Sequence, residues 1–324
     1  MAKHKCAVII PTKNALPIFQ NVLEAILRQK TEWPFEIIVI DSGSTDGTTD
    51  FIRSFPEVRL IDIDPRTFGH GRTRNQAIAA SDAEFVAFLT HDAQPFDENW
   101  LTNLVAAAEQ NERIAGVFGR HVAYDTASPF TKADLDKHFK GFMAHPLVVD
   151  RDTDPKRYEN DIGWRQFLHF YSDNNSLMRK SIWEKHPYPD VEFAEDQIGA
   201  RDMIDLGYKK AYAPNAIVYH SHDYNVLEQL RRAFDESRNF KKYFGYRLGP
   251  SLGSLPFVLI RSTVKVFRQR MDQEKYGNVC LKNRLSRSLR QNAVLIGHYL
   301  GANQERLPVQ FKNRLSLDYR LFKS

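Results

Sequence analysis

Hydrophobic residues come in short runs separated by polar loops along the first third of the chain. Four of these runs, rich in β-branched or aromatic side chains, predict buried strands at residues 7–10, 36–40, 58–63 and 85–89. Between them the apolar spacing predicts helices over residues 18–28, 73–80 and 100–111. Strands that alternate with helices across short loops predict an α/β fold with a largely parallel central sheet.

The pattern changes twice further along the chain. Residues 118–165 contain three prolines and many charges, and they predict a loop-rich insertion or a region that faces the acceptor. From residue 226 onward the pattern is helical and basic, with an interruption at residues 249–254. We therefore expect two parts, a sheet-containing domain over residues 1–224 and a helical C-terminal region over residues 225–324.

Charge is distributed unevenly between these two parts. Residues 225–324 hold 20 Lys and Arg against 7 Asp and Glu, whereas residues 1–224 hold 25 against 33. A basic segment of this kind suits nucleic acid, an anionic membrane surface, an acidic substrate, or simply a solvated helical face. The segment lacks zinc-ligand spacing and RNP-like aromatic residues, which argues against nucleic acid.

Composition narrows the class of protein further. With 324 residues and 42% hydrophobic content, the chain can bury a substantial core. Its apolar runs are far shorter than the roughly 20 residues that cross a bilayer, and its start lacks a signal-peptide pattern. Cys6 and Cys280 lie far apart in the sequence, which argues against a disulfide scaffold. A globular protein of the reducing cytoplasm fits these observations.

Three polar loops directly follow predicted strands, at residues 11–14, 41–46 and 90–94. Ligands of such sheets bind beyond the carboxyl ends of the strands, so we expect the three loops to open on one rim. Asp41 suits a hydrogen bond from a nucleobase or ribose, but it also suits an Asx-turn that closes its strand. Asp92, in the segment FLTHDAQP, suits either a metal ligand or a turn residue.

Residues 68–75, FGHGRTRN, combine two glycines, a predicted helix start and two arginines. Glycines free the backbone, a helix N-terminus offers unpaired N–H groups, and guanidinium groups match phosphate oxygens. The segment therefore suits a diphosphate, although a basic surface turn has the same composition.

Five motifs in order resemble those of family 2 glycosyltransferases: VIIPTKN (8–14), EIIVIDSGSTDGT (36–48), RTRNQAI (72–78), FLTHDAQP (88–95) and FAEDQIGAR (193–201). The resemblance covers residues 7 to about 222. It implies a GT-A fold, with a Rossmann-like, mixed but mostly parallel sheet flanked by helices and a basic helical extension. It further implies a nucleotide-sugar donor, usually a divalent metal, and inversion at the anomeric carbon. The segment FGHGRTRN also resembles the corresponding segment of rhamnosyltransferases, which implies transfer of L-rhamnose from dTDP-rhamnose to a bacterial surface glycan.

The resemblance also implies which residues meet the donor. Pro11 and Thr12 would contact the base or ribose, Asp41 the nucleobase, and Arg72 a phosphate. The full set expected at the donor nucleotide is Pro11, Thr12, Asn14, Asp41, Ser42, Ser44, Arg72, Arg74, Asn75 and His91. Residues 172–181, SDNNSLMRKS, are expected to line the donor-sugar or acceptor pocket, or to form a polar turn into a strand.

Asp92 stands where the family commonly carries a DxD cluster, and it is a single carboxylate here. By resemblance it would hold Mg²⁺ or Mn²⁺, both of which prefer oxygen ligands. His220 and His222 follow a predicted strand at residues 216–219, and their i, i+2 spacing allows both to face the metal. Either histidine, or neither, is compatible with the pattern.

Glu195 and Asp196 begin a predicted helix that runs to residue 206. An inverting transfer needs a general base for the acceptor hydroxyl, and adjacent helical carboxylates point about 100° apart. By resemblance Asp196 is the base and Glu195 its neighbour. An acidic first turn that complements the helix dipole is the structural alternative.

Other functions fit parts of this pattern. A nucleotidyltransferase shares the α/β core, but residues 8–17 lack the expected glycine-rich loop. A transferase that uses a UDP- or GDP-sugar, or a degenerate one that acts as an assembly partner, also fits. The implied acceptor is a polyprenyl-diphosphate-linked glycan. The basic C-terminal region would then lie on the inner face of the plasma membrane, or else pack on the core or make an oligomer contact.

Overall fold

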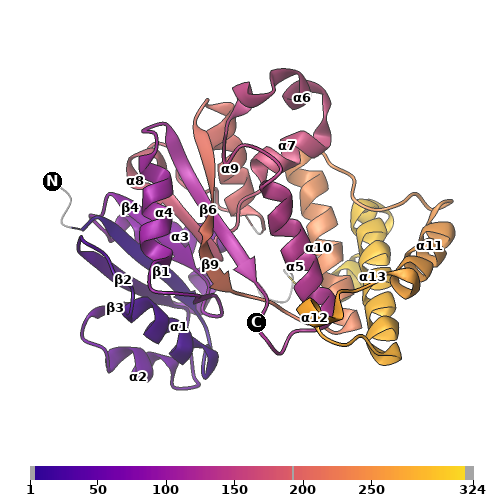
Figure 1. Cartoon of the computed structure of the whole chain (residues 1–324), viewed down its shortest axis with the longest axis horizontal. Helices are drawn as coiled ribbons and strands as arrows, with labels where there is room; N and C mark the ends of the chain where they lie inside the picture. Colours follow the sequence, from indigo (N-terminus) through magenta and orange to yellow (C-terminus); the bar gives the residue numbers. More distant parts are fainter. Residues whose placement is uncertain (1–3, 192, 318–324) are drawn as a thin grey trace. The chain divides into compact units, whose positions relative to one another are not determined.

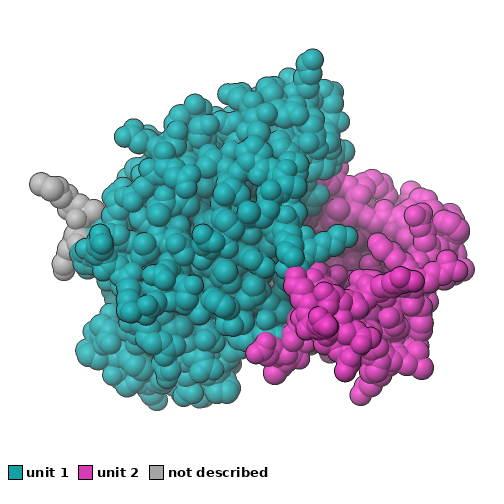
Figure 2. Space-filling view, in the orientation of Figure 1, with its two compact units in different colours: residues 1–124, 135–221 teal, residues 125–134, 222–324 magenta. Residues whose placement is uncertain are grey.

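The computed structural model describes residues 4–191 and 193–317 of the chain. Contacts divide the chain into two compact units, shown in different colours in Figure 2. The first unit holds the residues up to 124 together with 135–221, and the second holds residues 125–134 together with those from 222 onward. The division expected at residue 224 stays a prediction. The first residues of the predicted N-terminal domain, before residue 4, and the last residues of the predicted C-terminal region, after residue 317, lie outside the described residues.

The first unit is built on a mixed sheet in the order β3-β2-β1-β4-β8-β6-β9-β5, with β7 paired to β9. Figure 1 labels β1, β2, β3, β4, β6 and β9 of this sheet. Its first four strands are parallel: β1 (Cys6–Thr12), β2 (Phe35–Asp41), β3 (Val58–Asp62) and β4 (Phe85–Leu89). Thr12 lies opposite Asp41 in the register of β1 and β2. The loops that follow these two strands therefore leave the sheet at the same edge.

The remaining strands mix the two directions. β8 pairs antiparallel with both β4 and β6, whereas β6 and β9 run parallel. The short strands β5 and β7 both pair antiparallel with β9. The bounds are β5 (Gln94–Pro95), β6 (Ile114–Val122), β7 (Val148–Val149), β8 (Asn175–Arg179) and β9 (Lys209–Tyr219).

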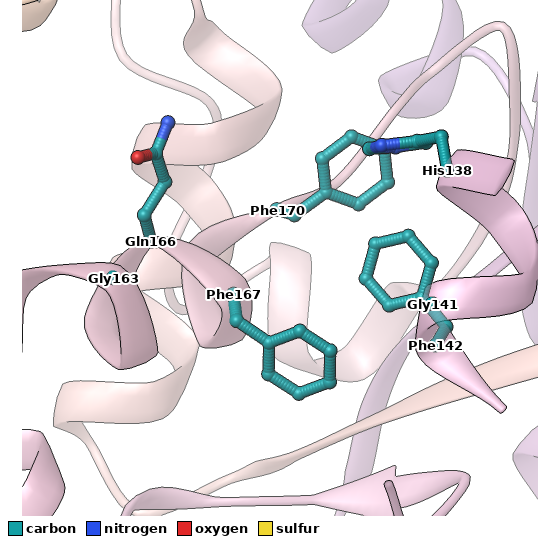
Figure 3. A pocket seen from close by; sticks show the side chains of 7 residues that line it. All are labelled: His138, Gly141, Phe142, Gly163, Gln166, Phe167 and Phe170. Carbon is teal, nitrogen blue, oxygen red and sulfur yellow. The ribbon is translucent and has the colours of Figure 1, made fainter. Parts of the chain in front are cut away.

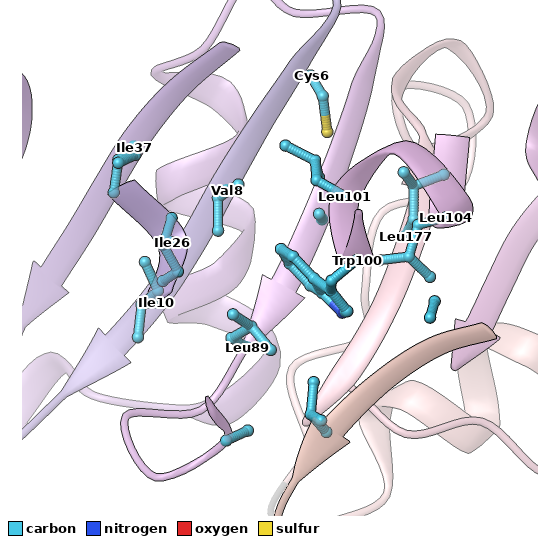
Figure 4. Close-up of a cluster of buried hydrophobic side chains, with 14 of the residues drawn as sticks. Cys6, Val8, Ile10, Ile26, Ile37, Leu89, Trp100, Leu101, Leu104 and Leu177 are labelled. Carbon is cyan, nitrogen blue, oxygen red and sulfur yellow. The ribbon is translucent and has the colours of Figure 1, made fainter. Parts of the chain in front are cut away.

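Apolar residues on both faces of the parallel strands explain why helices cover the sheet on two sides. Alternate residues of β1 point to opposite faces, so Val8 joins one buried cluster and Ile9 another. The first cluster includes side chains of α1 and α4, and Trp100 lies among them (Figure 4). The helices of this part are α1 (Ile18–Leu27), α2 (Thr48–Arg53), α3 (His70–Ala79), α4 (Trp100–Glu109), α8 (Lys180–Trp183) and α9 (Glu195–Asp205).

The interpretation of residues 118–165 as a loop-rich insertion is wrong. The stretch contains the end of β6 and then α5 (Pro129–Phe142), a 3-10 turn (Arg151–Thr153), α6 (Pro155–Asn160) and α7 (Ile162–His169). Pro129 and Pro155 are the first residues of α5 and α6, where a missing N–H costs no helical bond. Asp154 and Asp161 cap α6 and α7 with their side chains. Two of the three prolines that suggested loops, together with these two aspartates, are therefore helix-start signals, whereas Pro146 lies between α5 and β7 (Val148–Val149).

The second unit is helical from residue 226 onward. It contains α10 (Val226–Phe244), α11 (Leu255–Arg268), α12 (Gln273–Tyr276), α13 (Leu281–Ala302) and α14 (Val309–Leu315). α10 begins with a capping box of Asn225 and Glu228 and ends at Gly245, whose φ is 73°. In the part of the chain that is described, no helix combines the length and apolar content needed to cross a membrane.

α10 and α13 approach each other closely along one line. A Cβ atom on Gly297 would lie 2.5 Å from the carbonyl oxygen of Leu230. One turn later, a Cβ atom on Gly301 would lie 2.3 Å from the carbonyl oxygen of Phe234. The two glycines therefore let the backbones of the two helices pack against each other.

The segment 125–134 is held in the second unit by Asp223. The carboxylate of Asp223 accepts hydrogen bonds from the Ser128 amide at 2.7 Å and the Thr131 hydroxyl at 2.6 Å. Arg290 of α13 pairs with the same carboxylate at 2.8 Å. Burial opposes ionisation of Asp223, but these bonds lower its pKa to about 2. Asp134, in the same segment, pairs with Arg287 at 2.6 Å.

Candidate active site

Asp41 ends β2 and organises the rim of the sheet. Its buried carboxylate accepts four hydrogen bonds, from the Thr12 hydroxyl (2.9 Å), the Gly43 amide (2.9 Å), the Ser44 amide (2.7 Å) and the Ser44 hydroxyl (2.6 Å). These bonds form the Asx-turn that the sequence offers as one interpretation. A carboxylate has about four acceptor positions, so a nucleobase donor would have to displace the Thr12 or Ser44 hydroxyl.

The loops after β1 and β2 are fastened to each other. The Asn14 amide donates to the Ser44 hydroxyl at 2.7 Å, and the Asn14 side-chain oxygen accepts from the Thr45 amide at 2.8 Å. Ser42 donates to the Thr12 carbonyl through both its amide and its hydroxyl. The structure thus brings together the predicted residues Pro11, Thr12, Asn14, Asp41, Ser42 and Ser44 at one edge of the sheet. Their contact with a nucleotide stays a prediction.

The three residues predicted on α3 have different surroundings. Arg72 is exposed and pairs with Asp190 at 2.5 Å. Asn75 is engaged by one neighbouring segment, because it accepts from the Trp183 indole and the Tyr188 amide and donates to the Tyr188 carbonyl. Arg74 is buried and points toward α9. Their role at the donor stays a prediction, and only Arg72 is solvent-exposed among the three.

Arg74 lies between two buried carboxylates. Its Nη1 is 2.7 Å from Glu195 Oε1, and its Nε is 3.2 Å from Asp173 Oδ2. Asp196 adjoins this group, because its Oδ2 accepts the Asp173 amide at 3.3 Å and its Oδ1 accepts the Gln197 amide at 2.7 Å. We call Arg74, Asp173, Glu195 and Asp196 the acidic cluster. α9 begins at Glu195, so the helix start places the two predicted catalytic carboxylates here.

Three carboxylates share one guanidinium group in the acidic cluster. Burial raises the pKa of Asp196 well above its usual range, and the neighbouring Glu195 and Asp173 raise it further. Burial also raises the pKa of Asp173, against the opposing effect of Arg74. Asp196 is partly exposed, whereas Glu195 is buried. A partly exposed carboxylate whose pKa is raised is a stronger base than a free carboxylate, which suits a general base.

Two residues that support the acidic cluster were not predicted individually. Asp173 appeared only within the polar run at residues 172–181, and Tyr188 was not predicted at all. The Tyr188 hydroxyl donates to Asp173 Oδ1 at 3.0 Å, and the Ser176 hydroxyl donates to the same oxygen at 2.7 Å. Burial, followed by the charge of Asp173, raises the pKa of Tyr188 well above 10, so its hydroxyl remains a donor. Nothing in the sequence around Tyr188 links it to Asp173.

Asp92 and His220 come together at a second place on the rim. β5 pairs antiparallel with the end of β9, which brings the turn before β5 beside His220. Asp92 Oδ1 and His220 Nε2 are 3.7 Å apart, and both side chains are partly exposed. Ligand bonds to Mg²⁺ are about 2.0–2.1 Å, so two ligands of one ion lie about 3–4 Å apart and this pair fits. A carboxylate and an imidazole also suit Mn²⁺.

The other two residues predicted near the metal or donor have different places. His91 is partly exposed and precedes Asp92 in the turn after β4. His222 begins the second unit, where its ring stacks on Tyr224 with centroids 4.9 Å apart. A metal-ligand role for His222 stays a prediction.

Residues at the end of β6 support the Asp92–His220 pair. The His121 ring meets the His220 ring edge-on, with centroids 5.3 Å apart. Burial, followed by the nearby His220 and His138, lowers the pKa of His121 well below 6.5, so His121 is neutral. The Tyr124 hydroxyl donates to the Asp92 carbonyl at 3.1 Å. The sequence interpretation missed His121 and Tyr124 because it placed no strand there.

A pocket of about 330 Å³ lies in the first unit between α5 and α7 (Figure 3). Lys210 holds two of the residues that line the pocket, because its buried ammonium group donates to the carbonyls of Phe167 (2.9 Å) and Phe170 (2.7 Å). None of the residues predicted at the donor, metal or base lines it. Its lining residues are His138, Gly141, Phe142, Gly163, Gln166, Phe167 and Phe170.

The sheet order, the polar rim beyond β1 and β2 and the acidic cluster at the start of α9 together define the class, a transferase of the GT-A fold. The mannosyltransferase PcManGT from Pyrobaculum calidifontis, solved in complex with GDP-Man and Mn²⁺, has the same fold. The two structures superpose with a TM-score of 0.61 at 16% identity, over 94% of this chain and 88% of that one.

Sequence comparison identifies the family. The model of glycosyl transferase family 2 matches residues 7–186. The O-antigen chain rhamnosyltransferase RfbN of Salmonella typhimurium is 36% identical over 235 residues, which are 71% of each chain. The O-antigen chain rhamnosyltransferase WbaN of Salmonella anatum is 32% identical over 232 residues, which are 70% of each chain. The chain belongs to glycosyltransferase family 2. The predicted family, fold and enzyme class are confirmed.

Proposed function

We propose that this glycosyltransferase moves L-rhamnose from dTDP-rhamnose onto a hydroxyl group of a bacterial surface glycan, with inversion at the anomeric carbon. The observation that carries the proposal is the similarity to two O-antigen chain rhamnosyltransferases over about 70% of the chain. The segment FGHGRTRN supports the choice of sugar. The acceptor that fits this chemistry is a growing glycan on a polyprenyl diphosphate.

Asp196 is the proposed general base. Its carboxylate takes the proton of the acceptor hydroxyl while the hydroxyl oxygen bonds to the anomeric carbon and the bond to the diphosphate breaks. The amides of Asp173 and Gln197 hold the carboxylate in place. Glu195 is engaged by Arg74 and buried, which leaves Asp196 as the carboxylate of the pair that is open to a substrate.

The donor nucleotide is proposed to bind at the rim beyond β1 and β2. Displacement of the Thr12 or Ser44 hydroxyl from Asp41 would give the nucleobase a charged acceptor. Arg72 is the cation that can turn to a phosphate, since it is exposed and its present partner Asp190 is also exposed. Arg74 and Asn75 are proposed to act as positioning residues, because their side chains hold the acidic cluster and the segment near Tyr188.

Asp92 and His220 are the residues proposed to hold Mg²⁺ or Mn²⁺, with His222 as a further candidate. The ion would neutralise charge on the departing nucleoside diphosphate. The fit of the pair rests on the 3.7 Å separation and on the mixed oxygen and nitrogen donors. Among proteins of this fold, the mannosyltransferase from Pyrobaculum calidifontis is described with Mn²⁺.

Replacement of the base tests the proposal. In Asp196→Asn, transfer to a lipid-linked acceptor should fall by about 10²–10⁴-fold, because an amide cannot take the proton. The donor dissociation constant for dTDP-rhamnose, measured by calorimetry, should change little. Asp202→Asn is the matched control, since Asp202 lies on the same helix, is more exposed and pairs with Arg201.

Several outcomes would contradict the proposal. Turnover of UDP- or GDP-sugars in place of dTDP-rhamnose would show that the donor is a different nucleotide sugar. Failure of every nucleotide sugar to bind would favour a non-catalytic assembly partner. Equal loss of donor binding and transfer in Asp196→Asn would make Asp196 a structural residue.

The proposed setting is the cytoplasm, with the basic C-terminal region at the inner membrane face or in an oligomer contact.

A further inference from the structure

α11 leaves one row of apolar side chains in solvent. Phe257 and Ile260 are 66% and 65% exposed, and Val264 and Phe267 continue the row along the helix. These positions recur at intervals of three and four residues, so they lie on one side of α11. The opposite side, around Val266, is buried. A solvated helix that only packs against its neighbours would place polar residues on the outer face.

α13 carries a second exposed apolar row, at Leu281, Leu285 and Leu289. We call the exposed rows of α11 and α13 together the apolar stripe. The two helices run antiparallel, because Arg284 near the start of α13 donates to carbonyls at the end of α11. Further along α13, Asn292 reaches Thr263, which lies earlier in α11.

The two rows lie on the same side of this helix pair. One exposed residue of each row directly follows a residue at the interface: Val264 follows Thr263 on α11, and Leu289 follows Ser288 on α13. On a helix, each side chain points about 100° around the axis from the side chain before it. Because the two helices run in opposite directions, the residues that directly follow Thr263 and Ser288 point to the same side of the helix pair. The apolar stripe is therefore one surface with two helices beneath it.

The helices beneath the apolar stripe carry cations and no acids. α11 carries three cations, and neither α11 nor α13 contains Asp or Glu. Of the four cations of α13, Arg287 and Arg290 are paired with Asp134 and Asp223, so the cations of α11 carry the argument. Arg261, Lys265 and Arg268 lie on the exposed side of α11, next to the apolar row. The acids closest in the sequence are Asp272, which caps the short α12 between the two helices, and Glu274 within α12. Exposed apolar side chains bordered by cations are the pattern of a helix that lies in an anionic membrane surface.

A second copy of the chain fits this surface less well. Two such faces placed together would bring cations against cations, without an acid on either helix to compensate. Anionic lipid headgroups supply the opposite charge, and acyl chains accept the apolar side chains. We propose that α11 and α13 form a docking face for an anionic lipid surface. This inference goes beyond the proposed reaction; only its use, access to a lipid-linked acceptor, rests on the proposed function.

Vesicle binding by the whole protein tests the docking face. The wild-type protein should float with vesicles of phosphatidylglycerol and phosphatidylcholine, and not with phosphatidylcholine alone. The double variant Phe257→Ser and Ile260→Ser should bind at least about tenfold more weakly, because apolar burial is lost. The double variant Arg261→Glu and Lys265→Glu should lose binding by a similar factor and show less dependence on salt.

Matched controls separate the docking face from general stickiness. Leu206→Ser removes an apolar side chain that is 54% exposed in the first unit, and Lys156→Glu reverses an exposed cation on α6. Both should bind like wild type, and thermal unfolding should confirm that every variant is folded. Hydrolysis of the donor in solution measures the activity of the active site without a membrane, so failure to bind vesicles and failure of the proposed reaction can be told apart.

Three results would overturn the inference. The first is a wild-type protein that does not bind anionic vesicles. The second is binding that the stripe variants leave unchanged. The third is sedimentation velocity that shows a dimer which Phe257→Ser and Ile260→Ser dissociate, since the apolar stripe would then be an interface between copies.

Discussion

At the scale of single residues, Arg74 is the only cation in the acidic cluster, whose other three members are carboxylates. Its guanidinium group pairs with Asp173 and Glu195, and its own pKa is raised because their charges outweigh the effect of burial. Removal of one partner from a buried ion pair leaves an uncompensated charge, which is far more costly than loss of a surface pair. Arg74 thus makes it possible to keep three carboxylates at the start of α9.

Arg74→Met should lower the free energy of unfolding by about 3–5 kcal/mol. The folded-state pKa values of Asp173 and Asp196 are raised, so their contribution to stability is present below the unfolded pKa and is lost as pH rises through the folded pKa. Arg74 offsets that loss, and the variant should therefore be penalised more at about pH 8 than at about pH 5. Urea denaturation at the two pH values measures this. Equal penalties would show that Arg74 acts through packing alone.

Asp92 gives a second prediction at this scale. Asp92→Asn should weaken binding of the donor about tenfold in the presence of Mn²⁺, which corresponds to about 1.4 kcal/mol, because an amide is a poorer ligand than a carboxylate. Binding in the presence of EDTA should be unchanged. Asp50→Asn, at a carboxylate of α2 that is 87% exposed, is the control. An equal effect with and without the metal would remove Asp92 from the metal site.

The sequence could predict individual residues where a recognisable motif stands at the end of a strand or at the start of a helix. Asp41 and Asp92 follow the first pattern and Asp196 the second, and their elements lie where the pattern placed them. Residues that act through partners distant in sequence could not be selected. Tyr188 meets Asp173 only because α8, β8 and α9 pack together, and a hydrogen bond between side chains leaves no periodic trace.

At the scale of elements, the parallel strands and the helices predicted between them agree with the structure to within three residues at each end. Strand β4 spans 85–89 as expected, because an apolar run bounded by turn residues has a single interpretation there. α5 and α7 were missed because their prolines and acids also mark loops. A proline indicates a boundary, and only the surrounding structure decides whether a helix begins or a loop continues.

The contact between α10 and α13 gives a prediction for an element. Gly301→Ala should destabilise the protein by about 1–3 kcal/mol, since the added methyl would collide with the Phe234 carbonyl and the backbones would have to separate. Helix propensity alone would favour alanine by about 1 kcal/mol. Gly141→Ala on α5 is the control, because a Cβ there meets nothing within 4 Å and should be neutral or stabilising. Thermal unfolding of both variants compares the two; a stabilised Gly301→Ala would contradict the close approach.

At the scale of the whole molecule, the second unit is not simply the end of the chain. A protein shortened after residue 224 would lose Arg287 and Arg290, the partners of Asp134 and Asp223. We expect a lower soluble yield and rapid proteolysis within residues 125–134, because an exposed segment without its partners is readily cleaved. The chain of 324 residues with both arginines changed to alanine should show the same cleavage more weakly. Resistance of the shortened chain would show that the segment holds itself.

The membership of residues 125–134 in the second unit also bears on how enzymes of this kind can be recombined. If the helical unit differs between relatives that elongate different glycans, a chimera made by a single crossover near residue 224 would join one parent's helices to the other parent's 125–134 segment. Two crossovers, one on each side of that segment, would be needed in addition to the C-terminal one. The segment 125–134 and the C-terminal helices therefore have to come from the same parent. Substitutions at Asp134 and Arg287 are expected to covary among relatives.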